Sequence, residues 1–399
     1  MGAIRESIPV DYSELAAQSF RADLEAIAMS IDRRPVRRES ASPFRSADAS
    51  MAKEISRRFF LGSLAALGAA HVLPFGLAAR SGPRPADAGA QVIDVHHHLM
   101  PPKYLEVARD AILRVSAIPQ VVDWTIARSL DDMDKNGVRT AVVSISTPGV
   151  MFGGFKASRR LARECNEYAA KMASEYPGRF GFFAAVPLPD QEGSLQEIAY
   201  ALDSLHADGV GLLSNYDGKY LGDAAFAPVF EELQRRKAIV YAHPTFLSCC
   251  LNLAGLHVST EEFGFDTTRT ISSLLYSGTL SRCPDVKFIF SHGGGTLPFL
   301  AGRIGAAANR VSALLPHGAD YEFRKLHFDT ASVTNLAAMA AMLKLVPASQ
   351  VMFGTDFPWR AAGGSLHELR GLGLSEVDLR AIESQSAIGL FPRLNGTGS

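Results

Sequence analysis

The feature that most constrains the fold is a regular alternation of short β-rich runs and longer helical stretches from about residue 91 onward. This alternation is typical of parallel βα units and not of a β-sandwich. We expect eight strands, at residues 91–96, 139–146, 179–186, 209–213, 238–242, 286–291, 326–329 and 350–353. Helices are expected between them, including residues 155–175, 194–206, 224–236, 268–280 and 333–345. Eight such units in about 300 residues predict an α/β protein with a closed (β/α)8 TIM barrel.

The composition excludes several classes of protein. Lys and Arg number 40 and Asp and Glu 41, and no basic stripe interleaved with aromatic residues occurs, so nucleic acid is not an expected partner. A hydrophobic share of 47% with 20% charged residues predicts a globular chain and not a disordered one. The four cysteines are too few and too irregularly spaced for a disulfide framework or a CxxC metal site.

We place the barrel at residues 91–399. The chain before it divides into two parts. Residues 51–90 contain Arg57 and Arg58, then an apolar run and a small-residue end, which together form the pattern of an export signal. The paired arginines resemble a twin-arginine signal, which predicts the twin-arginine export machinery as a partner and a periplasmic or secreted location. A membrane anchor and a cytoplasmic location are the alternatives. Residues 1–50 are expected to be a poorly structured extension, with Met51 as a candidate start.

The first expected strand ends in three consecutive histidines. Barrels of this type place their chemistry at the C-terminal ends of the strands. Because alternate strand residues point to the same side, His96 and His98 share a side while His97 points away. The pair can therefore hold one ion, whereas the alternative is a surface histidine cluster.

Two further side chains at strand ends complete a ligand set. His243 closes the fifth expected strand and Asp356 follows the eighth. Taken alone, His243 is equally a buried structural histidine and Asp356 a helix cap. Their joint placement with the first-strand pair on one rim predicts a metal site. Three imidazoles and a carboxylate suit Zn²⁺, with Mn²⁺ or Fe²⁺ as alternatives.

The sixth expected strand ends at His292, followed by Gly293, Gly294 and Gly295. Glycines let the backbone come close to a ligand, and an imidazole at this position can move protons. The run is not a phosphate loop, because no Lys-Ser or Lys-Thr follows it. Arg303, one helical stretch later, can pair with a substrate carboxylate, or alternatively form a surface ion pair.

With these residues in place, the chain resembles the amidohydrolase superfamily, in the branch of aminocarboxymuconate-semialdehyde decarboxylase (amidohydrolase family 2). The resemblance covers residues 92 to about 391. It rests on His96-x-His98, on His243-Pro244, on His292-Gly-Gly-Gly through Arg303, and on Gly354-Thr355-Asp356. The resemblance implies a metal-dependent hydrolase type of barrel in which His96, His98, His243 and Asp356 bind the metal. It also implies that His292 is the catalytic acid or base and that Arg303 binds the substrate carboxylate, in some relatives across a dimer interface.

Within that branch, the segments 94–102, 146–150, 214–218 and 266–269 look closest to 6-methylsalicylate decarboxylase-like proteins. Binuclear members carry a bridging lysine near the end of strand four, where this chain has Leu212-Leu213-Ser214-Asn215. One divalent ion per chain is therefore implied, together with a homodimer. The second carboxylate-binding arginine of the dicarboxylate decarboxylases has no clear counterpart, which favours a monocarboxylic substrate.

The function implied by the resemblance is non-oxidative decarboxylation of a hydroxy-aromatic, salicylate-type or related carboxylic acid by a metal-dependent carboxy-lyase. Hydrolysis of a lactone or amide is the alternative, because the same ion, base and arginine serve both reactions. Asn215, Tyr216 and Arg269 on the expected rim are candidates for deciding between the two. A metal-binding protein without catalysis is the third class, and the presence of every ligand and of the proton carrier argues against it.

Overall fold

The computed structural model of this chain describes residues 92–245 and 255–395. The predicted extension at 1–50 and the twin-arginine-like segment at 51–90 lie outside the described residues. Within the described part, no helix combines the length and the apolar character needed to cross a membrane.

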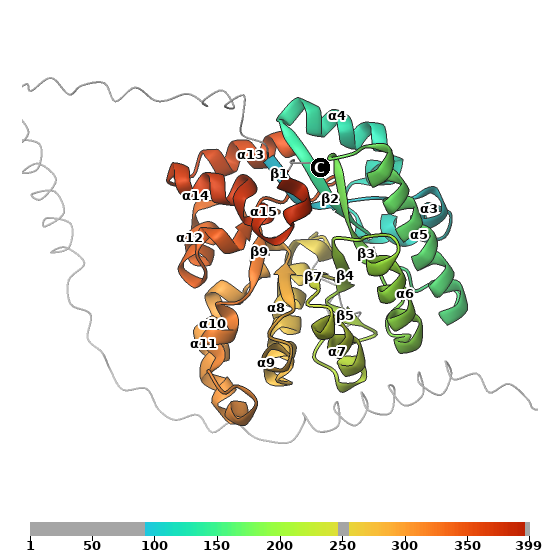
Figure 1. Ribbon diagram of the computed structural model, residues 1–399. Coiled ribbons are helices and arrows are strands. Elements are labelled where there is room, and N and C mark those ends of the chain that lie inside the picture. The colour runs from blue at the N-terminus through green and yellow to red at the C-terminus, as the bar shows by residue number, and fades with distance from the viewer. Residues whose placement is uncertain (1–91, 246–254, 396–399) are drawn as a thin grey trace, which may run out of the picture. The chain divides into compact units, whose positions relative to one another are not determined.

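Eight parallel strands form the centre of the fold and follow one another in chain order. Figure 1 shows strands at the centre with helices around them. They are β1 (Val92–His98), β2 (Val138–Ser144), β3 (Phe180–Ala185), β4 (Gly209–Leu213), β7 (Ile239–His243), β8 (Lys287–Phe290), β9 (His327–Asp329) and β10 (Val351–Met352). The ring closes between β1 and β10, where Val95 N donates to Phe353 O at 2.9 Å and His98 N to Phe357 O at 2.8 Å. The eight predicted strands and the (β/α)8 barrel are confirmed, with strand ends shifted by one or two residues.

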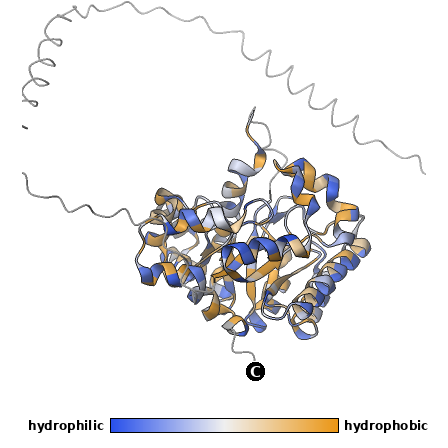
Figure 2. Cartoon of the chain, turned by 90° about the horizontal axis from the view of Figure 1, so that it is seen from above, coloured by the Kyte–Doolittle hydropathy of each residue, from blue (hydrophilic) through white to orange (hydrophobic). Residues whose placement is uncertain are grey.

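Helices surround the strands. The longer ones are α3 (Pro102–Val115), α4 (Ile126–Asn136), α5 (Phe155–Glu175), α6 (Gln191–Asp203), α7 (Ala227–Arg235), α8 (Val258–Tyr276), α10 (Leu297–Ala308), α12 (Leu336–Leu345) and α13 (Ala362–Arg370). Short elements are the hairpin β5 (Asn215–Tyr216) with β6 (Lys219–Tyr220), and the helices α9 (Thr279–Arg282), α11 (Ala319–Phe323), α14 (Glu376–Arg380) and α15 (Ser386–Leu390). Figure 2 shows hydrophobic residues along the strands and both polar and hydrophobic residues on the helices.

One predicted helix boundary is wrong in a way that matters for the site. The helix expected at 268–280 is α8, which begins ten residues earlier, at Val258, and ends at Tyr276. The reason is local, because the His257 side chain accepts from Ser259 N and so caps the helix, and Glu261 lies in the first turn, where a carboxylate is favoured. The additional turns of α8 line the cavity described below.

The core has two parts. Side chains between the strands and the helices form the larger one, including Tyr104, Phe226 and Phe230, which are almost completely buried. Inside the barrel a second cluster contains Phe183 and Tyr241, whose rings stack with centroids 4.8 Å apart. These filled layers leave room for chemistry only above the C-terminal ends of the strands.

Candidate metal centre

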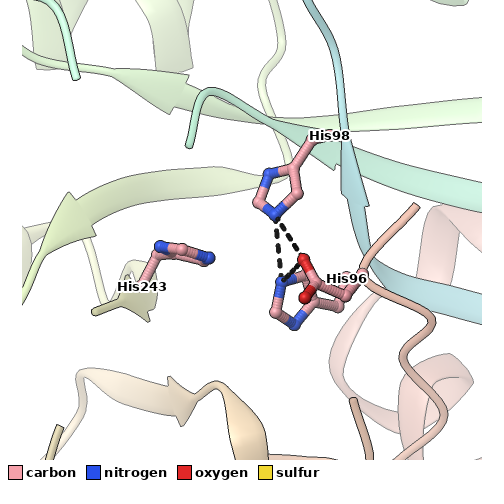
Figure 3. A group of neighbouring side chains, drawn as sticks. His96, His98 and His243 are labelled. Atoms are coloured by element: carbon pink, nitrogen blue, oxygen red, sulfur yellow. Dashed lines mark hydrogen bonds and ion pairs between the residues drawn. The ribbon is translucent and has the colours of Figure 1, made fainter. Parts of the chain in front are cut away.

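The structure brings the four predicted ligands together at the C-terminal end of the barrel (Figure 3). His96 and His98 come from β1, His243 ends β7, and Asp356 follows β10. One ligand atom from each lies within 4.8 Å of the others. His96 Nε2 and His98 Nε2 are 3.1 Å apart, and Asp356 Oδ1 is 3.3 Å from the first and 3.1 Å from the second. Three imidazoles and a carboxylate converging in this way fit one divalent cation.

The histidine triplet behaves as the alternation of a strand predicts. His97 points away from the cluster, where its Nδ1 donates to Asp94 Oδ2 at 3.0 Å and its Nε2 accepts from Ser129 Oγ at 2.9 Å. Its ring stacks on Phe357 with centroids 4.6 Å apart. All three histidines of the triplet are buried, so the alternative of a surface histidine cluster is wrong.

Asp329, at the end of β9, orients the candidate ligand His96 through the ring nitrogen that faces away from the cluster. Its Oδ2 accepts from His96 Nδ1 at 2.9 Å and from the Tyr241 hydroxyl at 3.0 Å. Its Oδ1 accepts the backbone N–H groups of His292 at 2.9 Å and Ala331 at 3.0 Å. Because His96 donates through Nδ1, its Nε2 lone pair faces the cluster, which is the tautomer a metal ligand needs. Asp329 is a site residue missing from the prediction, and the one signal for it in the sequence is a carboxylate at the end of an expected strand.

Asp94 fixes the loop that carries Asp356. Its Oδ1 accepts from Thr355 N at 3.0 Å and its Oδ2 from Thr355 Oγ1 at 2.6 Å. Asp356 N donates to His96 O at 2.8 Å, and Asp356 has a φ of 72°, a left-handed conformation that Asp tolerates better than most residues. A Cβ on Gly354 would lie 2.8 Å from His96 Cβ, so only glycine fits there. The Asp356 carboxylate therefore contacts imidazoles, and the helix-cap alternative is wrong.

The electrostatics of the cluster favour a positive charge. Burial opposes protonation of His96, but the carboxylates of Asp329 and Asp356 outweigh it and raise its pKa to about 10. Burial also raises the pKa of Asp356, but His96 and His98 outweigh it and hold that pKa well below its usual range. The pKa of His243 is lowered well below its usual value by burial and by the neighbouring imidazoles. Two buried carboxylates thus favour a positive charge in this cluster, carried by the proton on His96 or by a bound cation in its place.

His292 presents one unpaired nitrogen at this site. It follows β8 in a left-handed conformation with a φ of 51°. Nδ1 donates to Ala331 O at 3.1 Å, while the buried Nε2 has no hydrogen-bond partner among the described residues. The ring centroid lies 4.8 Å from that of His96. Burial lowers the pKa of His292. Nε2 is therefore available for proton exchange.

The glycines after His292 also have a packing role. A Cβ on Gly295 would lie 2.0 Å from the Gly264 carbonyl of α8, and one on Gly294 would lie 2.5 Å from the Phe328 ring. These glycines let the turn pack against α8 and β9. Gly295 also lines the cavity described below, so the predicted approach of this backbone to a ligand stays a prediction.

A cavity of about 620 Å³ opens in front of His243, His292 and Asp356. Its volume lies within the range of small-molecule binding sites and is ample for a single-ring ligand. The apolar lining residues are Val115, Ala117, Ile118, Phe263, Phe265, Val333 and Trp359. The polar lining residues include Ser146, Thr147, Ser259, Thr260, Glu261, Thr296, Ser332 and Arg360.

Other predicted residues are not brought into this cavity. Arg303 lies exposed on α10 and is not among the lining residues of its own chain. Asn215 donates to Asp266 Oδ2 at 2.8 Å, and Tyr216 accepts from Leu213 N at 3.0 Å. Arg269 pairs with Glu262 at 3.3 Å. These three rim candidates hold the loop after β4 and α8 in place, outside the cavity lining.

Comparison with known proteins places this geometry in a family. The model of the amidohydrolase family matches residues 93–393. A decarboxylase of Aspergillus niger, yanB, is 39% identical over 75% of this chain and 87% of its own length. The 6-methylsalicylic acid decarboxylase of Penicillium expansum is 36% identical over 76% of this chain and 97% of its own length.

A solved structure supports the fold independently. Dihydroxybenzoic acid decarboxylase from Polaromonas sp., with bound manganese and the inhibitor 2-nitroresorcinol, has a TM-score of 0.66 and 22% identity. It covers 76% of this chain and 97% of that one. The two relatives are named as decarboxylases, which favours decarboxylation over the hydrolysis of a lactone or amide. The match over nearly the whole barrel confirms the predicted resemblance, and the chain belongs to the amidohydrolase family.

Proposed function

We propose that this chain is a metal-dependent carboxy-lyase that removes the carboxylate of a hydroxy-aromatic, salicylate-type acid without oxidation. The observation that carries the proposal is the four-residue cluster beside the unpaired Nε2 of His292, at the end of a cavity that has room for a small aromatic acid. The similarity to a 6-methylsalicylic acid decarboxylase supports the substrate class.

His96, His98, His243 and Asp356 would hold one divalent ion. Zn²⁺ suits this donor set, and Mn²⁺ is the alternative, because manganese is bound in the Polaromonas structure. When bound, the ion would supply a Lewis acid for the substrate carboxylate and the neighbouring hydroxyl. Asp329 keeps His96 in the tautomer that ligation requires.

The proton chemistry belongs to His292. With Nδ1 engaged by Ala331 O, Nε2 is the nitrogen that takes up a proton and releases it toward the cavity. Protonated Nε2 gives its proton to the ring carbon that carries the carboxylate. The bond from that carbon to the carboxylate then breaks, its electron pair restores the aromatic ring, and CO₂ leaves. A pKa lowered by burial makes the protonated imidazole a stronger acid for this step.

The charges around the cavity favour a substrate with one carboxylate. Among the described lining residues, Arg360 is the single Lys or Arg, and its Nη2 is already paired with Glu368 at 2.9 Å. Arg303 is exposed on α10, so we expect it to reach a substrate only from a second copy in a homodimer. Export by the twin-arginine machinery remains a prediction from residues 51–90 alone.

The direct test measures metal content and CO₂ release together. The full chain would be purified, loaded with Zn²⁺ or Mn²⁺ in turn, and supplied with salicylic, 6-methylsalicylic and 2,6-dihydroxybenzoic acids. About one ion per chain with CO₂ evolved from at least one acid is the expected result. Bound metal without CO₂, but with turnover of a lactone or amide, would establish the hydrolase instead. A chain that binds no divalent ion would overturn the proposal.

A further inference from the structure

A hydrogen bond joins one wall of the cavity to the loop of Asp356. The indole Nε1 of Trp359 donates to the Ser116 hydroxyl at 2.9 Å, joining positions 243 apart in the chain. Ser116 is buried and directly follows α3. Its hydroxyl also donates to Ile118 O at 2.9 Å and accepts from Ile118 N at 3.1 Å. A serine hydroxyl offers one donor and two acceptor sites, and all three are used here.

Trp359 lies directly beside the candidate ligands. Its backbone N donates to Asp356 O at 2.8 Å. Its ring meets that of His98 edge to face, with centroids 5.1 Å apart and planes at 88°. The same indole lines the cavity. A shift of this ring would therefore change its contact with His98 on one side and its hydrogen bond to Ser116 on the other.

The segment that Ser116 holds forms an apolar wall of the same cavity. Val115, Ala117 and Ile118 are lining residues, and none of their side chains carries a charge. Residues 116–118 lie between α3 and the next short helix and belong to no helix or strand. The two bonds between the Ser116 hydroxyl and Ile118 constrain the backbone of this wall, and the bond to the Trp359 indole joins it to the loop of Asp356.

The opposite side of the cavity differs in chemistry and in origin. Phe263 of α8 meets His243 edge to face, with ring centroids 5.9 Å apart. Glu261, on the same helix, adds a negative charge to the lining. His243 and His98 come from the fifth and first strands of an eight-stranded ring, so Phe263 and Trp359 approach the site from opposite sides. An uncharged substituent on a bound ring is best placed against the wall of Val115, Ala117 and Ile118.

We propose that Ser116 is a specificity-determining residue that acts through Trp359. The bond between them holds the wall of Val115, Ala117 and Ile118 against an alkyl substituent on the ring of the aromatic acid. The site thereby prefers alkyl-substituted salicylates to unsubstituted salicylate. This inference rests on the proposed substrate class and adds the ring substituent to it.

The two tryptophans of the chain allow the test to be made by binding alone. Trp124 also donates its indole N–H to a serine, Ser129, at 2.9 Å, but it does not line the cavity. A Trp124→Phe variant leaves Trp359 as the single indole, so that the emission reports on Trp359 alone. Compared with the unaltered chain, the same variant is the control for the loss of an indole-to-serine bond away from the cavity. In that background, metal-loaded full chain would be titrated with 6-methylsalicylic acid and with salicylic acid while the Trp359 emission is followed.

Ser116→Ala removes all three bonds, and because the bond to Trp359 is the one that reaches the site, we expect 6-methylsalicylic acid to bind about fivefold more weakly and salicylic acid less than twofold. Ser116→Thr keeps the hydroxyl, and the extended backbone at Ser116, with φ −109° and ψ 127°, accepts a β-branched residue. Thr is therefore expected to restore the preference. Trp359→Phe, followed through the KM for CO₂ release, is expected to lose the same preference.

Several results would overturn the inference: equal weakening of both acids in Ser116→Ala, no weakening of either, or no change in Trp359 emission with either acid. The outcome also separates this inference from the proposed reaction. Altered binding preference without CO₂ from any acid would refute the reaction and leave the wall in place. CO₂ release with the same ratio of KM values in Ser116→Ala and the unaltered chain would refute the wall and leave the reaction in place.

Discussion

The two sides of the candidate metal centre are built differently. On the side of β1 and β10, His96 is fixed by the Asp329 carboxylate, and the loop of Asp356 is fixed by Asp94. On the side of β7 and β8, His243 and His292 are each held through Nδ1 by one backbone carbonyl, at 2.8 and 3.1 Å. Carboxylates both orient an imidazole and raise its affinity for positive charge, whereas a carbonyl mainly orients it. We infer that the first side retains the ion and that the second side keeps His292 free for proton transfer.

The largest expected effect comes from removing His96, the candidate ligand that the Asp329 carboxylate holds. His96→Ala removes a ligand and leaves Asp329 without its imidazole partner. We expect metal content to fall from about one ion per chain to nearly none, and CO₂ release to be lost with it. Elemental analysis of the purified variant measures the first, and a CO₂ assay the second.

His97→Asn is the matched control for that change, because His97 is equally buried but points away from the cluster. It is expected to lose some stability and to keep the ion. Equal metal loss in both variants would mean that folding, and not ligation, explains the result.

Replacing His292, on the side of β7 and β8, should lower the rate of catalysis and leave metal binding unchanged. His292→Asn removes the proton carrier without touching the four candidate ligands. We expect kcat to fall by about 10²–10⁴ while metal content stays unchanged. Loss of the ion in this variant would contradict the division of roles between the two sides, and an unchanged kcat would refute the role of His292.

A smaller effect is expected from the support behind His96. Asp329→Asn weakens the bond to His96 Nδ1, and we expect metal affinity to fall by about 10–100-fold. Tyr241→Phe removes the second donor to the same carboxylate oxygen and should lower metal affinity by less. Competition with a chelator measures both. Equal affinities in Asp329→Asn and the unaltered chain would remove the distinction between the two sides.

The smallest expected effect is a change of stability with pH, and it comes from His327, at the start of β9. His327 begins β9, and burial lowers its pKa to about 4. Between pH 6.5 and 4 the unfolded chain binds a proton that the folded chain does not, so stability is lost as the pH falls through this window. We expect the loss in the free energy of unfolding to reach about 2 kcal/mol. This is less than the pKa difference alone corresponds to, because the His327 side chain keeps some contact with solvent.

His327→Gln lacks this titration, so its free energy of unfolding should fall less over the same pH range. Chemical denaturation of both proteins at several pH values measures the difference. Identical pH dependence of the two would show that His327 is not the group responsible.

Several parts of this structure follow from sequence patterns, for identifiable reasons. The eight strands are found because buried parallel strands are short apolar runs, and the candidate ligands because barrel chemistry lies at strand ends. Asp329 satisfies the same rule, but its partners His96 and Tyr241 are 233 and 88 positions away, and no local pattern reports such contacts. The start of α8 was misplaced because its cap is an unusual one, a histidine side chain.

Arg303 shows a different limit. Its motif position implies a role toward substrate, but its helix, α10, leaves it exposed and outside the cavity lining. A pattern along one chain carries no information about which copy's cavity an exposed side chain serves. The residue type indicates that Arg303 can bind a carboxylate. The sequence does not indicate whether Arg303 reaches the cavity of its own chain or that of a second copy.

The closure of the barrel between β1 and β10 also sets an order of events during synthesis. His98 and Asp356 meet although 258 positions separate them, so the ribosome releases the histidines of β1 long before the carboxylate that joins them. Contacts so distant in the chain form late in folding. No partly made chain can assemble the full set of four side chains. The complete candidate site therefore exists only after the chain has been synthesised past Asp356, and we expect the metals available at that stage to compete for it.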